Sequence, residues 1–290
     1  MHTLFCIAVF ASVDSIAVAL TDLEQWKEFK HAHEKNYPHP ATDAYHYAIF
    51  QKSLKEVKEH NAKYEAGEVT YSKKLVKYSD LPKEQWPQLP PLLISDNFIE
   101  DDISEDIGNV EIPEAIDWRE KGYVTHVKSE GAICGDCYNF GAIGSLEAFN
   151  KRVNGELVAL KTIYPLNDKF GQCKFNIMEA VNTTVRGFKH VFGENKLKAV
   201  VGTVGPVTIA FYASPAFETA NNGIFYDPTC KKNDTYNHSV VVVGYGTELG
   251  EDYWIIKNSW TSAWGDGGYL KMIRNRDANC HVGDWAMYPV

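Results

Sequence analysis

The chain has 290 residues, a formal net charge of −9, 44% hydrophobic and 23% charged residues, and a sequence pI near 5.6. This composition is typical of a soluble globular protein with one large or two modest domains. The acidic balance argues against a nucleic-acid partner, which requires a basic face. No apolar run reaches membrane-spanning length.

The first twenty residues, "MHTLFCIAVFASVDSIAVAL", predict a signal peptide over residues 1–19. An apolar stretch, interrupted by Asp14, is followed by the small-residue cleavage pattern Ala17-Val18-Ala19. A buried N-terminal segment is the alternative, but the polar residues that follow make it the weaker one. We therefore expect entry into the secretory pathway, to a lysosomal or extracellular destination, and loss of Cys6 with the signal.

Two helical patterns follow, over residues 23–33 and 42–64, and Gly67 ends the second. The segment "VTYSKKLVKYSDLP" alternates and predicts a strand followed by a turn. Residues 86–110 are rich in Pro, Asp and Glu and include "EDDISED". We interpret them as an exposed acidic linker that is open to proteolysis.

The rest of the chain predicts helices over residues 138–153 and 196–204, which end at Asn154-Gly155 and Gly205-Pro206. The strands follow later, in "PVTIAFY", "HSVVVVGYG", "YWIIKNSW" and "GGYLKMI". We expect an α+β domain with a late antiparallel sheet.

Cys137 lies in "KSEGAICGDCYNFGAIGSLEAF", three residues after Cys134, and could be a metal ligand, half of a disulfide or a nucleophile. No second Cys or His pair stands at zinc spacing, and the setting of a thioredoxin motif is absent. Without Cys6 an odd number of cysteines remains, which suggests two disulfides and one free thiol. These cysteines are Cys134, Cys137, Cys173, Cys230 and Cys280.

A nucleophilic thiol needs a base and a group that orients the base. The candidates are His238, which opens an apolar strand, and Asn258 in "IIKNSWTSAWGDGGY". Cys137 stands where a helix begins, and the positive end of the helix dipole lowers a thiol pKa. A lone C-x-x-C is more often a redox or zinc pair and a lone strand-end His is usually structural, but the coincidence of all three favours a nucleophile.

Three segments resemble the signature regions of the papain family of cysteine proteases, and most of all its cathepsin L group. They are "IPEAIDWREKGYVTHVKSEGAICGDCYNFGAIGSLE", "NHSVVVVGYG" and "DYWIIKNSWTSAWGDGGYLKMIRN". The resemblance implies a papain-like two-lobed α+β protease over residues 111–290, preceded by a helical inhibitory propeptide over residues 20–85.

The resemblance also implies roles for individual residues. Cys137 would be the nucleophile, His238 its base, and Asn258 the orienter of His238, with Trp260 shielding the hydrogen bond between the last two. The oxyanion donor of the family is a Gln, and this chain has Glu130 in its place. A carboxylate repels a developing oxyanion and donates a hydrogen bond only when protonated. Asp136 replaces a small residue, and we expect its charge to raise the thiol pKa.

The spacing also departs from the family. His238 follows Cys137 by 101 residues and Asn258 by 121, against about 130 and up to about 150 in the family. We place the loss between Leu160 and Tyr164, which shortens the left lobe and removes a Gly-rich substrate-binding strip and two cysteines.

By the resemblance Cys230 pairs with Cys280, while Cys134 and Cys173 have lost their usual partners. We hypothesise that these two pair with each other, although four cysteines allow three connectivities.

Trp285 falls at the floor of the main specificity pocket of the family, where it would shorten the pocket; packing into the gap left by the deletion is an equal alternative. Among three N-x-S/T sequons, Asn182 and Asn233 are plausible glycosylation sites. We expect Asn237, next to the proposed base, to be unmodified.

We therefore expect a monomeric cysteine endopeptidase made as a zymogen, without metal or cofactor, which acts on proteins or peptides and is inhibited by its own propeptide. Glu130, Asp136, Trp285 and the missing strip favour the alternative, a catalytically weak relative that binds peptides or proteases. A third hypothesis is a shortened product that folds poorly, because the margin of stability is only about 5–15 kcal/mol.

Overall fold

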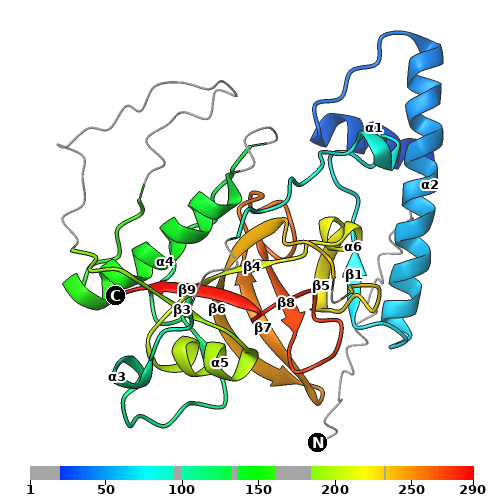
Figure 1. Ribbon diagram of the computed structural model, residues 1–290. Helices are drawn as coiled ribbons and strands as arrows, with labels where there is room; N and C mark the ends of the chain where they lie inside the picture. The colour runs from blue at the N-terminus through cyan, green and yellow to red at the C-terminus, as the bar shows by residue number, and fades with distance from the viewer. Residues whose placement is uncertain (1–19, 95–98, 132–135, 161–183, 232) are drawn as a thin grey trace, which may run out of the picture.

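The structure is a computed structural model that describes residues 20–94, 99–131, 136–160, 184–231 and 233–290. Two helices lead into a sheet-containing body, and a third long helix lies against that body (Figure 1). The helices are α1 (Asp22–Ala32), α2 (Pro40–Glu65), the 3₁₀ helix η1 (Lys83–Gln85), α3 (Ser104–Ile107), α4 (Cys137–Asn154), α5 (Glu194–Thr203) and α6 (Pro215–Glu218). The strands are β1 (Tyr71–Lys73), β2 (Ile116–Asp117), β3 (Phe188–Val191), β4 (Val207–Phe211), β5 (Ala220–Phe225), β6 (His238–Glu248), β7 (Glu251–Lys257), β8 (Tyr269–Ile273) and β9 (Trp285–Pro289).

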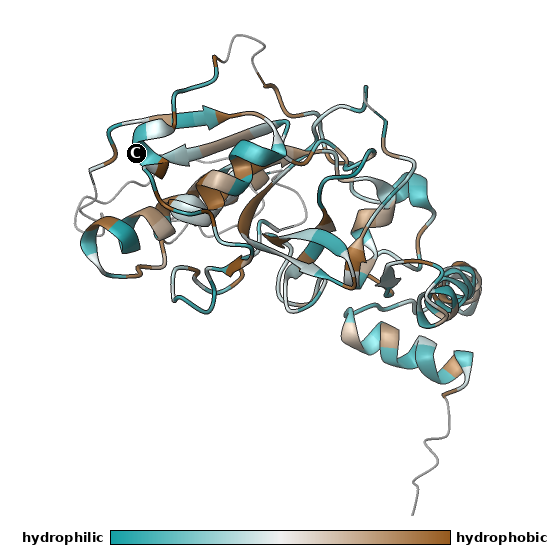
Figure 2. Ribbon diagram, turned by 90° about the horizontal axis from the view of Figure 1, so that it is seen from below, coloured by the Kyte–Doolittle hydropathy of each residue, from teal (hydrophilic) through white to brown (hydrophobic). Residues whose placement is uncertain are grey.

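Helices α1 and α2 form a small N-terminal unit with a core of its own. Trp26 and Phe29 from α1 pack on Phe50 and Leu54 from α2. Thr21 begins α1 with a capping box, which satisfies free N–H groups of the first turn. Figure 2 views α2 nearly along its axis, beside the sheet-containing body. None of the helices in the described ranges combines the length and the apolar character needed to cross a bilayer.

Strand β1 ties the N-terminal unit to the body because it pairs antiparallel with β5. Tyr71 stands opposite Gly223, and its ring contacts Phe225 with centroids 4.9 Å apart. The amide of Asn61 on α2 holds the other end of β1 by bonding the backbone N–H and C=O of Lys73. The segment before the linker therefore contributes a strand to the edge of the large sheet.

The large sheet has the order β1-β5-β8-β7-β6-β4-β9-β3, with β2 added to β6. Helix α4 packs closely on it because two of its residues have no side chain. A Cβ at Gly141 would stand 2.6 Å from Ser239 Oγ, and one at Gly144 would stand 2.6 Å from Val241 Cγ2. These two glycines bring the start of α4, and with it Cys137, against the beginning of β6.

Most of the expected elements are present with bounds shifted by one or two residues, and the differences are local. Strands β3, β5 and β9 were not predicted, since each is short and β5 carries the turn-like residues Asn-Asn-Gly. The expectation that residues 86–110 form an exposed linker is wrong at Trp86 and Ile103, which are buried at 9% and 7% exposure, the latter in the main core. Helix α3 follows Ile103 directly.

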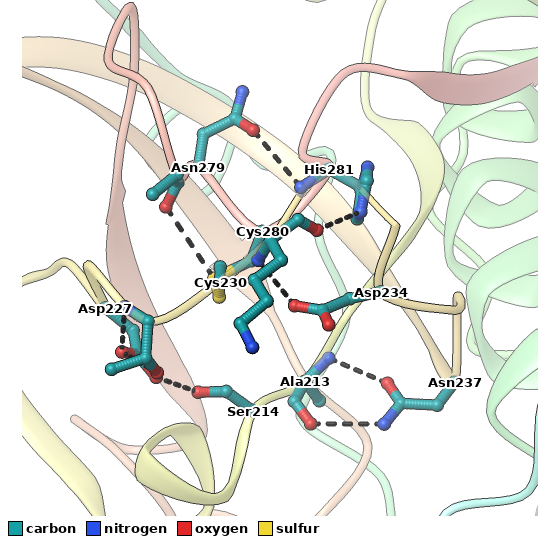
Figure 3. The surroundings of a disulfide bond; sticks show 12 residues. Ala213, Ser214, Asp227, Cys230, Asp234, Asn237, Asn279, Cys280 and His281 are labelled. Atoms are coloured by element: carbon teal, nitrogen blue, oxygen red, sulfur yellow. Dashed lines mark hydrogen bonds between the residues drawn. A yellow bond between two sulfur atoms is a disulfide. The ribbon is translucent and has the colours of Figure 1, made fainter.

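Cys230 and Cys280, the pair implied by the resemblance, form a disulfide across 50 residues of sequence (Figure 3). Cys137 is the free cysteine in the part of the chain that the structure describes. Cys134, Cys173 and the sequon residue Asn182 lie outside the described residues, as does the stretch 161–183 beside the expected shortening.

Candidate active site

The three proposed catalytic residues stand at the ends of neighbouring elements. Cys137 is the first residue of α4, His238 is the first residue of β6, and Asn258 follows directly after β7. Strands β6 and β7 pair antiparallel, with Val241 opposite Lys257, which brings Asn258 to the beginning of β6. All three side chains are buried, at 3%, 0% and 3% exposure respectively.

The ring of His238 is held in a defined orientation by Asn258. Nε2 of His238 lies 2.8 Å from Oδ1 of Asn258, and the backbone N–H of Ser259 donates to the same oxygen. Because that atom is an acceptor, Nε2 must carry the proton. Nδ1 of His238 is buried and has no hydrogen-bond partner among the described residues. In the neutral ring it holds a free lone pair that can accept a proton.

Aromatic side chains enclose His238. The indole of Trp260 stacks on its ring, with centroids 4.6 Å apart, and Phe211 and Phe217 stand at 5.7 and 6.3 Å. Burial lowers the pKa of His238 to about 4, against the smaller effect of the hydrogen bond to Asn258. The imidazole is therefore neutral over most of the acidic range.

Burial also raises the pKa of the Cys137 thiol, to about 11, and the charge of Glu130 adds to the shift. Backbone hydrogen bonding from Ser239 and Tyr138 acts in the opposite direction. In this state burial therefore outweighs the lowering of the thiol pKa that was expected from the start of the helix. Cys137 and His238 are both neutral, a protonated thiol and a free imidazole.

Glu130 is buried at 4% exposure and is joined to the same cluster. Its Oε1 accepts a hydrogen bond from Nε1 of Trp260 at 2.5 Å, and its backbone N–H donates to the carbonyl of Ser259. Oε2 is buried without a hydrogen-bond partner within the described ranges. Burial raises the pKa of Glu130 to about 7, and the charge of Asp136 adds to this.

The effect of Asp136 differs from what its position in sequence suggested. Asp136 precedes α4 but its side chain makes no capping hydrogen bond. The charge that acts on the Cys137 thiol is that of Glu130, and Asp136 acts in turn on Glu130. The contact between Glu130 and Trp260, 130 residues apart, has no signal in sequence spacing.

A buried ionic cluster lies between α4 and the strand that leads to Asn258. Glu147 on α4 accepts from Nζ of Lys128 at 2.6 Å and from the hydroxyl of Thr125 at 2.5 Å. Lys257, next to Asn258, donates to the same Thr125 hydroxyl, and burial lowers its pKa to about 8. Lys128 pairs directly with Glu147, and Thr125 links Lys257 to the same carboxylate through its hydroxyl, so the cluster joins α4 to β7.

The structure also describes the positions of the other residues singled out in the sequence. Trp285 is half-buried on β9 opposite Ala210, and its ring faces the edge of His190 at 6.0 Å. Asn233 is exposed, while the amide of Asn237 bonds the backbone N–H and C=O of Ala213 (Figure 3). Across the described ranges, no three His, Cys, Asp or Glu side chains are grouped so as to hold a metal ion.

Comparison with known proteins gives two family matches. The papain family cysteine protease profile matches residues 112–163 and 148–290, and the cathepsin propeptide inhibitor domain (I29) profile matches residues 26–86. The protease profile matches in two pieces that overlap over residues 148–163, which includes part of the segment where we place the shortening.

Individual relatives and solved structures agree with these matches. The chain is 34% identical to a cathepsin L-like peptidase of Aedes aegypti, and the alignment covers all of both chains. Because the alignment has 348 positions and this chain has 290 residues, part of that relative has no counterpart here. It is 31% identical to a cathepsin L-like proteinase of Phaedon cochleariae, with 98% of both chains covered.

Among solved structures, digestive procathepsin L2 from the larval midgut of Tenebrio molitor superposes with a TM-score of 0.82 at 30% identity. The match covers 93% of this chain and all of the other, which is itself a proenzyme. The chain belongs to the papain family of cysteine proteases as a cathepsin L-like proenzyme, with an I29 propeptide inhibitor domain ahead of an α+β protease domain.

Proposed function

We propose that the chain is a cysteine endopeptidase in which Cys137 is the nucleophile, His238 its base and Asn258 the orienter of the base. The observation that carries this proposal is the hydrogen bond between His238 Nε2 and Asn258 Oδ1, which leaves the buried Nδ1 free. Thiol activation requires a base with one ring nitrogen held in place, here Nε2 of His238, and the other free to accept the thiol proton, here Nδ1.

In the proposed reaction the Cys137 sulfur attacks the carbonyl carbon of a peptide bond while the thiol proton moves to Nδ1 of His238. His238 then gives this proton to the leaving amine, and a thioester remains on Cys137. Water, deprotonated by His238, attacks the thioester. The acid product leaves, and the proton returns to the sulfur.

Glu130 sets the pH at which this reaction can run. With Oε1 bound to Trp260, only Oε2 remains to face a developing oxyanion. The charged carboxylate repels the oxyanion, whereas the protonated acid donates an O–H to it. Because burial raises the pKa of Glu130 to about 7, the donating form predominates below that pH. We propose that activity rises as the pH falls below neutrality.

The substrates would be proteins or peptides, and the N-terminal domain would inhibit the site in cis. The β1–β5 pairing and the bond from the Leu92 N–H to the carbonyl of Tyr236, two residues before His238, support this inhibition. A disulfide between Cys230 and Cys280 favours an oxidising compartment, and several relatives are digestive proteinases. We infer a secretory route to the lysosome or the extracellular space.

A second candidate function is a weak or inactive relative that binds peptides or proteases. The carboxyl of Glu130 at the oxyanion position and the raised pKa of Cys137 favour it. In that case the site would bind peptides without cleaving them.

Labelling with an epoxide that traps activated papain-type cysteines separates the two. Propeptide-free protein would be labelled between about pH 4 and pH 7, with Cys137→Ala as the control. Labelling that increases as the pH falls through the titration of Glu130 supports the acid-dependent protease. A folded sample that is unlabelled at every pH supports the binding function.

A further inference from the structure

Residues between the two family matches, 87–111, have no assigned role, and part of this stretch is bound to the protease domain. The acidic segment, defined as residues 100–106, lies along β3 and α5 and is held by polar contacts and by one apolar side chain. It carries the sequence "EDDISED". The surface that receives it is basic.

β3 is the last strand of the sheet order and has β9 as its one partner in the part of the sheet that the structure describes. Asp101 covers its outer edge. The backbone N–H of Asp101 donates to the carbonyl of His190 at 3.1 Å, and the N–H of His190 donates to Oδ2 of Asp101 at 2.7 Å. An exposed strand edge is a ready template for an extended peptide, and here one residue of the acidic segment uses it.

Charged contacts flank this edge on both sides. Nζ of Lys196 lies 2.5 Å from Glu100, whose other oxygen accepts the backbone N–H of Phe192. Nζ of Lys189 donates to Asp106 at 2.6 Å and to the carbonyl of Asp102 at 2.8 Å. The hydroxyl of Tyr288 on β9 donates to Asp106 as well, at 2.6 Å.

The pKa values of the charged residues shift in the direction that favours their ionised forms. The hydrogen bond from Lys196 lowers the pKa of Glu100. The contact with Asp106 raises the pKa of Lys189. Ile103 adds an apolar anchor between the charged residues, since it is 7% exposed in the main core. The site thus selects carboxylates on both sides of one apolar residue.

We propose that the outer edge of β3, with Lys189, His190 and Lys196, is a binding site for an acidic peptide that pairs with the strand edge at one residue and turns into a short helix after it, as the acidic segment does at Asp101 and α3. In the proenzyme the acidic segment fills it in cis. The following residues, Gly108 to Glu111, are exposed, so a cut there would release the segment and open the site to an acidic stretch of a substrate protein. This proposal does not depend on catalysis by Cys137.

The test uses the full chain and a fluorescent synthetic peptide of residues 99–108. The wild-type chain should bind the peptide weakly because the site is occupied. A full chain with the cis segment disabled by Glu100→Gln, Asp101→Asn and Asp106→Asn should bind it saturably and more weakly at high salt. Adding Lys189→Glu should reduce this binding at least about tenfold, while adding Lys231→Ala, at an exposed lysine outside the site, should not.

Equal binding by the wild-type and disabled chains, or none by either, would overturn the proposal. A pair of charge-reversing substitutions within the chain shows whether an effect comes from the proposed contact or from misfolding. Lys189→Glu should make residues 99–107 sensitive to thermolysin, and Asp106→Lys in the same chain should restore protection. Failure of this pair to restore protection would also count against the site.

Discussion

The indole of Trp260 stacks on the imidazole of His238 with ring centroids 4.6 Å apart and an angle of 29° between the planes. The same indole donates its N–H to Glu130. Trp260 therefore has a contact beyond the shielding role that the family resemblance implies for it. It connects the proposed base to the carboxyl group at the proposed oxyanion position, so substitutions at either end should change the pH dependence of the site.

Glu130→Gln should raise kcat/KM for peptide hydrolysis most above the pKa of Glu130. At pH 7 about half of the wild-type carboxyls already carry the donating proton, so the gain there should be only about twofold, whereas at pH 9 it should reach about 10², because an amide supplies a neutral donor where the carboxylate repels. It should also lower the pKa of Cys137, since the charge of Glu130 is its second cause after burial. The acid-side advantage of the wild-type enzyme should disappear, because a group with a pKa near 7 no longer titrates. The pH profile of kcat/KM measures all three effects.

The matched control is Glu120→Gln, at an exposed carboxylate of the same domain. It should leave the profile unchanged. If Glu130→Gln is no faster than the wild type at pH 9, where the wild-type carboxyl is charged, the carboxyl of Glu130 does not face the oxyanion.

Trp260→Phe should move the acidic rise in activity to higher pH. The substitution keeps an aromatic ring over His238 but removes the N–H that donates to Glu130, and that bond lowers the pKa of the carboxyl. A carboxyl that loses it binds its proton more tightly, so the donating acid persists to higher pH. We expect a shift of about one pH unit, equivalent to about 1.4 kcal/mol. An unchanged midpoint in the pH profile would show that Glu130 does not control it.

Sequence motifs identified the family and supplied the proposed site residues, because short, chemically constrained segments surround Cys137, His238 and Asn258. Helices with regular apolar spacing, such as α2 and α4, were also predictable. Both follow from local rules of periodicity and capping.

What could not be predicted depends on contacts between distant segments. The hydrogen bond of Glu130 to Trp260 spans 130 residues, and Ile103 is buried in the main core although acidic residues surround it in the sequence. The direction of the pKa shift at Cys137 could not be predicted from the sequence either. A helix start lowers a thiol pKa, but burial, which sequence does not reveal, outweighs it here.

Gly223→Ala should loosen the propeptide strand. Gly223 has φ of +88°, and a Cβ there would lie 2.3 Å from the carbonyl oxygen of Thr70, which must move. That oxygen accepts the N–H of Ile224, so the β1–β5 pairing weakens. Hydrogen exchange of a peptide covering residues 70–74 in the full chain should accelerate.

Gly250→Ala is the control for backbone strain. Gly250 has φ of +83° but no neighbouring atom within 4 Å of the added Cβ. It should lose some stability through the same unfavourable φ while residues 70–74 keep their protection. Equal acceleration in both variants would mean that general destabilisation, and not the strand contact, exposes β1.

Counting thiols on the secreted, unfolded protein tests the second disulfide. With Cys6 removed and Cys230 bonded to Cys280, pairing of Cys134 with Cys173 leaves one reactive thiol, that of Cys137. Three reactive thiols would mean that the two cysteines stay reduced after loss of their family partners.

Removing the first disulfide should destabilise the protease domain strongly. The Cys230–Cys280 bond closes a segment of 50 residues that contains β6, β7 and β8, and the backbone N–H of Tyr212 after β4 donates to the carbonyl of Cys280. For a loop of this length the chain-entropy model gives about 4 kcal/mol. The double variant Cys230→Ser with Cys280→Ser should lower the free energy of unfolding by an amount of this order in a denaturant titration. Because the bond lies outside the cluster of Glu130, Trp260 and His238, the fraction that remains folded should keep the wild-type pH profile. A changed profile in that fraction would mean that the disulfide also positions the strand on which His238 lies.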